Sequence, residues 1–134
     1  MQFNRNRHSV YKLTYHLVVV TKYRHPVISA QIKKRLEEIT YDLFMKWKCE
    51  ILEINGEEDH LHILFDAPPQ INLANTINSF KTVTSRYIRK EFSKELKKYY
   101  WKPYFWSRSY LIVTTGGAPM ESIKKYIEEQ DRED

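Results

Sequence analysis

Two segments with helical spacing of apolar residues, separated by a pair of strand-like runs, constrain the fold of this chain most. In residues 29–48, and again in residues 72–96, apolar side chains recur every three or four positions, as on one face of an α-helix. Between them, residues 49–55 and 59–65 are typical of strands, and a short turn around Gly56–Glu58 indicates that these strands form a hairpin.

Further strand-like runs lie outside this unit, at residues 9–23 and 109–115, and a short helix is predicted over residues 118–130. The order strand–helix–strand–strand–helix–strand is that of ferredoxin-like or RRM-like α+β folds, in which an antiparallel sheet carries two helices on one face. The sequence therefore predicts a single domain over residues 1–134. The other face of the sheet is left for nucleic acid, a partner or a second copy of the chain.

Two histidines occupy alternate positions of the strand predicted over residues 59–65. Because side chains alternate across a strand, Leu61, Ile63 and Phe65 share the core face, whereas His60 and His62 share the opposite face. Neutral imidazole is a common metal ligand, so the two rings could converge on one ion, with a third ligand from elsewhere. The alternative is a pair of exposed histidines with no ligand on a solvated sheet face.

Composition favours an anionic partner and excludes several classes of protein. The net charge is +5, and aromatic residues, 14% of the chain, interleave with Lys and Arg in residues 97–110. Such a pattern suits unpaired nucleic acid, although these rings could equally be core. One cysteine allows no internal disulfide, no apolar run is long enough for a transmembrane helix, and the N-terminus lacks the apolar region of a secretory signal. We therefore expect a protein of the cytosol.

The last predicted helix carries a tyrosine and a glutamine on one side. Met120, Ile123 and Ile127 form an apolar stripe, and Tyr126 and Gln130, four positions apart, lie on the adjoining face. A phenol is a poor nucleophile unless activated, and a nearby divalent cation could activate it. A glutamine carbonyl is a neutral oxygen ligand. The alternative is that the tyrosine borders the core and the glutamine is solvated.

Together these motifs resemble the HUH single-tyrosine transposases of the insertion-sequence 200/605 family. HUH stands for His–hydrophobic–His, which His60-Leu61-His62 match, and a Y-x-x-x-Q helix follows a glycine pair near the end of the chain. The resemblance extends over nearly the whole chain, through YHLVVVTKYRHPV, EEDHLHILFDAPP and WSRSYLIVTTGGAPMESIKKYIEEQ. Phosphate-binding loops, HExxH zinc helices, CxxC pairs and GxSxG elbows are absent from the sequence.

The resemblance implies an enzyme that cuts and rejoins single-stranded DNA at insertion-sequence ends through a 5′-phosphotyrosine intermediate. By position, Tyr126 is then the nucleophile, and His60, His62 and Gln130 are metal ligands. Imidazoles alone would suit zinc or another transition metal, but the resemblance favours Mg²⁺ or Mn²⁺ as the cofactor.

An acidic run, Glu57-Glu58-Asp59, lies beside the histidine pair. Strand alternation would place Asp59 on the face opposite His60. We therefore expect Asp59 to be a solvated turn residue and not a direct metal ligand.

The resemblance also implies a homodimer, because excision requires two cuts and each chain offers one such tyrosine. In the family, the tyrosine helix of one subunit completes the histidine site of the other. Residues 117–134 are therefore expected to be a mobile catalytic helix and tail. Gly116 and Gly117 are the expected hinge, since residues without Cβ atoms permit wide backbone changes.

The implied partner is single-stranded DNA with hairpin ends. Contacts to it are predicted at five basic residues, Lys22, Arg24, Lys81, Arg86 and Arg89. Two alternatives remain open. One is a non-catalytic, RRM-like hairpin-binding module that needs neither the tyrosine nor a metal, and the other is a related HUH nickase acting on repeat elements.

Overall fold

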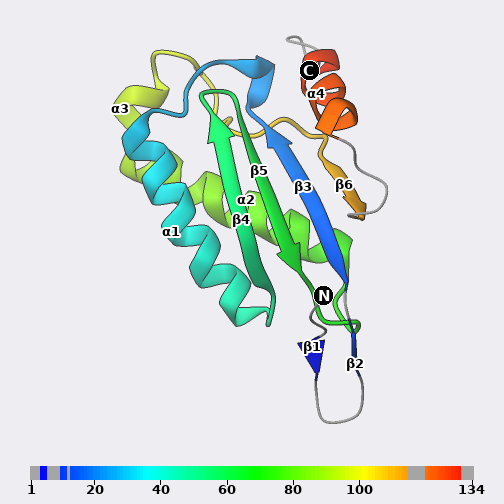
Figure 1. The fold of residues 1–134 in the computed structure, drawn as a ribbon. Helices are drawn as coiled ribbons and strands as arrows, with labels where there is room; N and C mark the ends of the chain where they lie inside the picture. Colours follow the sequence, from blue (N-terminus) through cyan, green and yellow to red (C-terminus); the bar gives the residue numbers. More distant parts are fainter. Residues whose placement is uncertain (1–3, 6–9, 12, 115–119, 131–134) are drawn as a thin grey trace.

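The computed structural model describes residues 4–5, 10–11, 13–114 and 120–130 of the chain. At its centre is a four-stranded antiparallel sheet in the order β4-β5-β3-β6 (Figure 1). These strands are β3 (Thr14–Val20), β4 (Glu50–Glu57), β5 (His60–Asp66) and β6 (Leu111–Thr114). A separate two-stranded ladder joins β1 (Asn4–Arg5) to β2 (Val10–Tyr11).

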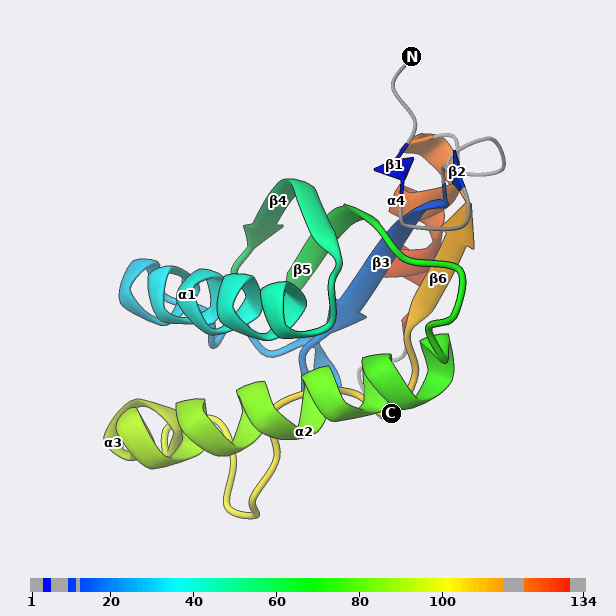
Figure 2. The same cartoon turned by 90° about the horizontal axis from the view of Figure 1, so that it is seen from below.

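Helices cover both faces of the sheet. They are α1 (Ala30–Lys46), α2 (Leu73–Glu91), the short α3 (Ser93–Leu96) and α4 (Met120–Glu129), and a 3₁₀ turn, η1 (Lys22–Arg24), follows β3. Figure 2 shows α1 and α2 on one side of the sheet and α4 on the other. No helix in the described part of the chain is long and apolar enough to cross a membrane.

This order of elements confirms the predicted ferredoxin-like α+β fold, and the helices begin where local chemistry favours it. Ser29 is the N-cap of α1, because its Oγ accepts a hydrogen bond from the Ile32 amide at 3.2 Å. Asn72 caps α2 in the same way. The predicted helix over residues 72–96 is divided, because α2 ends at Glu91 and α3 begins at Ser93.

The main core lies between the sheet and the helix pair α1 and α2. Leu61, Ile63 and Phe65 of β5 are all buried there, which confirms the predicted core face of this strand. Leu17 and Val19 of β3 join them. The histidines of β5 therefore lie on the opposite face, together with α4.

The sequence suggested a turn that begins at Gly56, but the strand does not end there. β4 continues through Gly56 to Glu57, and only residues 58–59 form the turn. A Cβ atom at Gly56 would lie 2.7 Å from the carbonyl oxygen of His60. The glycine therefore serves the close approach of two backbones within the hairpin.

The aromatic segment at 97–110 belongs largely to the core. Tyr100, Phe105 and Trp106 are buried, whereas Trp101 is 86% exposed. The Nε1–H of Trp106 donates to the Thr84 hydroxyl at 2.9 Å. The alternative in which these rings are core is therefore correct for most of them, and the segment anchors the approach to β6.

Candidate active site

Three imidazoles, and not two, lie on the sheet face that carries the predicted pair. His16 of β3 lies beside His62 of β5, with 2.8 Å between its Nδ1 and the Nε2 of His62. Their rings are stacked, with centroids 5.1 Å apart. His16 is not among the residues predicted from the sequence. Its place follows from the register of β3 against β5, which no local pattern specifies.

The surroundings of His62 favour its neutral form. Burial lowers its pKa below the usual value near 6.5, the charge of His16 lowers it further, and Glu53 opposes the shift. A metal ligand must be unprotonated, so this environment suits His62 for that role at neutral pH.

His60 is bound to a carboxylate. Its Nδ1 lies 2.9 Å from Oδ1 of Asp59, and the other oxygen of Asp59 lies 3.3 Å from Nη2 of Arg24. The expectation that Asp59 points away from His60 is wrong. Asp59 lies in the turn, outside the strand, so strand alternation does not govern its side chain.

The residues at this end of the hairpin fit a divalent cation. One ligand atom each from Glu57, Asp59 and His60 can lie within 4.8 Å of one another. Oxygen and imidazole donors together are a set that Mg²⁺ or Mn²⁺ accepts, whereas imidazoles alone favour softer metals. Glu57 is not among the ligands predicted from the sequence.

Helix α4 packs against the same sheet face. Ile123, 2% exposed, contacts Val18 and Val20 of β3 in a small cluster separate from the main core, with Ile127 beside it. The guanidinium of Arg24 donates to the Glu128 carbonyl near the end of α4, at 3.4 Å. Between the helix and the hairpin is a cavity of about 480 Å³ lined by both histidines of β5.

Tyr126 and Gln130 both contact Ser109, which precedes β6. The hydroxyl of Tyr126 donates to Oγ of Ser109 at 3.2 Å, and Ser109 donates to Oε1 of Gln130 at 2.7 Å. Neither residue is among the described residues that line the cavity beside His60 and His62. The structure therefore places the histidines of β5 in one cluster and Tyr126 with Gln130 in another, and it does not bring the two clusters together. Ser109 was not predicted, since a serine before a strand carries no signal of this contact.

Two lysines among the predicted DNA contacts are, like Arg24, engaged within the protein. Lys22 is only 8% exposed, and its Nζ lies 5.1 Å from the ring centres of Tyr23 and Tyr104. Nζ of Lys81 donates to the Arg108 carbonyl at 2.9 Å. These two lysines hold the segment before β6 against the rest of the molecule.

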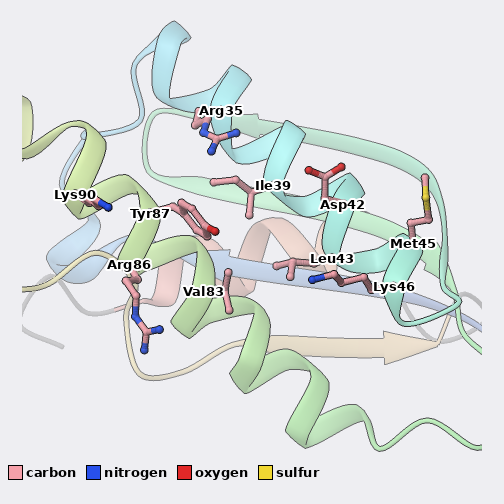
Figure 3. A pocket seen from close by; sticks show the side chains of 10 residues that line it. All are labelled: Arg35, Ile39, Asp42, Leu43, Met45, Lys46, Val83, Arg86, Tyr87 and Lys90. Carbon is pink, nitrogen blue, oxygen red and sulfur yellow. The ribbon is translucent and has the colours of Figure 1, made fainter.

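Arg86 lines a groove of about 810 Å³ between α1 and α2 (Figure 3). Lys46 and Lys90 also line it, but Arg35 is paired with Glu91 at 2.8 Å. The groove lies on the helical side of the sheet, away from the histidines. It is a separate surface from the candidate active site.

Arg89 lines a more uniformly basic groove of about 290 Å³ between α2 and the segment before β6. Its described lining includes Lys81, Arg89, Arg108 and Tyr104 and contains no carboxylate. The predicted hinge, Gly116 and Gly117, lies outside the described residues.

Comparison with known proteins identifies the family. A family model described as "Transposase IS200 like" matches residues 9–130. The chain belongs to the IS200-like transposase family. It is 31% identical to the ISDra2 transposase TnpA of Deinococcus radiodurans over 130 residues, which are 97% of this chain and 92% of that protein. It is 30% identical to the IS200 transposase of Salmonella typhimurium over 95% of this chain and 82% of that one.

Solved structures agree with this family membership. A crystal structure of a candidate transposase from Deinococcus radiodurans R1 superimposes on this IS200-like transposase with a TM-score of 0.87 and 30% identity, over 96% of this chain and 98% of that one. The structure of a REP-associated tyrosine transposase bound to a REP hairpin has a TM-score of 0.56 and 12% identity, over 93% of this chain and 68% of that one. At that identity the second match supports the fold alone.

Proposed function

We propose that this IS200-like transposase cuts and rejoins single-stranded DNA at insertion-sequence ends, with Tyr126 as the nucleophile. The observation that carries the proposal is the family match over residues 9–130, which includes both the His60–His62 pair and the Tyr126–Gln130 helix. The lowered pKa of His62, and the carboxylate of Glu57 close to His60, support a metal-dependent reaction.

In the proposed reaction, the phenolate oxygen of Tyr126 attacks the phosphorus of a DNA phosphodiester. The bond from phosphorus to the 3′ oxygen breaks, so that a 5′-phosphotyrosine and a free 3′-OH result. Because the phosphotyrosine is itself an ester, the 3′-OH of another strand can reverse the step and rejoin DNA without ATP. A bound Mg²⁺ or Mn²⁺ would polarise the phosphate and favour the phenolate. His60, His62 and Gln130 are the protein groups proposed to hold it.

We further propose that two copies of the chain complete each other's sites. Tyr126 is not among the described residues that line the cavity beside the histidines, and its hydroxyl donates to Oγ of Ser109 instead. A move of α4 onto a second copy would bring the tyrosine of one chain to the histidines of the other. The expected mobility of residues 117–134 and the hinge at Gly116 and Gly117 belong to this proposal.

The DNA ligand is proposed to include a hairpin, as in the distant REP-associated relative that was solved with one. The groove lined by Lys81, Arg89 and Arg108 is a suitable surface for phosphates, because cations line it without an opposing carboxylate. Arg24, in the cavity, and Arg86, in the groove of Figure 3, remain proposed contacts.

One assay tests the chemistry. Labelled single-stranded DNA carrying an element-end hairpin is incubated with the protein, with Mg²⁺ or with chelator, and covalent adducts are separated under denaturing conditions. We expect an adduct that requires the metal, disappears in Tyr126→Phe and persists in Tyr41→Phe, a control on an exposed tyrosine of α1. DNA binding without any adduct in the wild type would instead support the non-catalytic hairpin-binding module.

A further inference from the structure

The imidazole of His60 is oriented by its neighbour in the chain. Its Nδ1 lies 2.9 Å from a carboxylate oxygen of Asp59, and only 14% of the His60 side chain is exposed. An ionised carboxylate can only accept a hydrogen bond, so Nδ1 must carry the proton. A neutral His60 then has its lone pair on Nε2, the nitrogen that remains for a metal ion.

The Asp59 carboxylate is itself fixed in position. Its second oxygen lies 3.3 Å from Nη2 of Arg24, and 17% of the Asp59 side chain is exposed. The backbone of the turn is also held, because the Asp59 carbonyl accepts from the amide of Thr21 at 2.9 Å and from its hydroxyl at 3.2 Å. The Glu58 carbonyl accepts from the Ile28 amide at 2.9 Å. Both the side chain and the backbone of Asp59 are therefore fixed in position by contacts within the protein.

Arg24 reaches Asp59 from an uncommon backbone conformation. Tyr23 and Arg24 have φ angles of 59° and 54°, in the left-handed region that residues with a Cβ rarely adopt. Such conformations persist where the surrounding structure specifies them. The same guanidinium donates to the Glu128 carbonyl on α4, so it connects the Asp59–His60 pair to the helix that carries Tyr126.

The two histidines of β5 differ in this respect. The ring contact of His62 is at Nε2 and goes to the imidazole of His16, whereas His60 has a carboxylate at Nδ1. Histidines that bind metals commonly donate their second ring N–H to a carboxylate, which sets the tautomer and increases the basicity of the ligand. His60 has this arrangement, with Asp59 as the carboxylate.

We infer that Asp59, held by Arg24, is a positioning residue that fixes His60 in the Nδ1–H tautomer and aims its Nε2 at the cation site. The assignment of a cation to Nε2 rests on the proposed function. The tautomer does not depend on it, because the hydrogen bond to Asp59 forms within the protein alone.

The first test uses the metal-free protein. The ¹⁵N chemical shifts of the histidine rings, recorded at about pH 8.5 where neutral imidazole prevails, report which nitrogen carries the proton. We expect the Nδ1–H form of His60 in the wild type and a shift towards Nε2–H, which free histidine favours, in Asp59→Ala. Glu58→Gln is the matched control, because it removes an exposed carboxylate from the same turn. An unchanged Nδ1–H form of His60 in Asp59→Ala would overturn the inference.

The second test measures Mn²⁺ affinity by electron paramagnetic resonance, without DNA. Loss of a carboxylate that orients a histidine ligand typically costs about 10- to 100-fold in metal affinity, and we expect a loss of this size in Asp59→Ala. Arg24→Gln should lose less, since Asp59 remains, and Glu58→Gln should stay within about twofold of the wild type. Circular dichroism and thermal unfolding of each variant verify that it is folded.

The outcomes separate the inference from the proposed function. Lost Mn²⁺ affinity with an unchanged His60 tautomer would make Asp59 a direct ligand, which contradicts the positioning role. A wild type that shows the expected tautomers but binds no Mn²⁺ would refute the metal-dependent function and leave the orientation of His60 by Asp59 established. Adduct formation in the DNA assay is not needed for either reading.

Discussion

The docking of α4 on the sheet is centred on the buried side chain of Ile123, and Ile123→Ala tests its contribution. Ile123 is 2% exposed against Val18 and Val20, in a cluster that is separate from the main core. The substitution removes three carbon groups, which at about 0.8 kcal/mol each amounts to about 2.4 kcal/mol of lost docking energy. That energy corresponds to a roughly fiftyfold change in the ratio of undocked to docked helix. The global free energy of unfolding should change much less, because the core beneath α1 and α2 is untouched.

Hydrogen exchange measures this docking directly. Amides in the C-terminal turns of α4 should exchange roughly fiftyfold faster in Ile123→Ala, while amides of β3 and β5 keep their protection. Lys125→Ala is the control, since that side chain is exposed on the same helix. Unchanged exchange in α4, or an equal loss of protection in β5, would refute the reasoning that this helix is a separately docked element.

Two further predictions concern the hairpin and the histidines. Because burial lowers the pKa of His62 below its unfolded value near 6.5, the unfolded chain binds more protons, so stability is lost as pH falls below about 6.5. His62→Asn should flatten this slope in urea unfolding between about pH 7.5 and pH 5, and an identical slope would contradict it. Gly56→Ala should destabilise the protein by about 1–3 kcal/mol and shift the His60 amide resonance, because the new Cβ would meet the His60 carbonyl at 2.7 Å. Equal or greater stability in urea would refute that close approach.

Periodicity was sufficient to predict the fold and the sheet face on which the histidines of β5 lie. The alternation in β5 places Leu61, Ile63 and Phe65 in the core, and the structure confirms it. A serine before an apolar helical repeat is a common N-cap, and the hydroxyl of Ser29 caps α1 in this way. These features depend on residues near one another in the sequence, where the strand and helix repeats determine the direction of each side chain.

The remaining features of the site depend on contacts between distant segments. His16 meets His62 only because β3 pairs with β5 in a particular register. Asp59 turns back onto His60 because it lies in a tight turn to which the strand repeat does not apply. The contact of Ser109 with Tyr126 could be predicted only if the docking position of α4 were known. The apolar stripe of α4 shows that one face of the helix is buried, but not against which residues.

The histidines of one copy are proposed to act with the tyrosine of another, and mixing two inactive variants tests this most directly. One variant carries His60→Ala and His62→Ala, and the other, distinguished by a mass tag, carries Tyr126→Phe. Each alone should form no covalent adduct with hairpin DNA in Mg²⁺. The mixture, after subunit exchange, should form an adduct on the chain that lacks the histidines. No adduct in the mixture, while the wild type remains active and exchange is verified by mass, would contradict the claim.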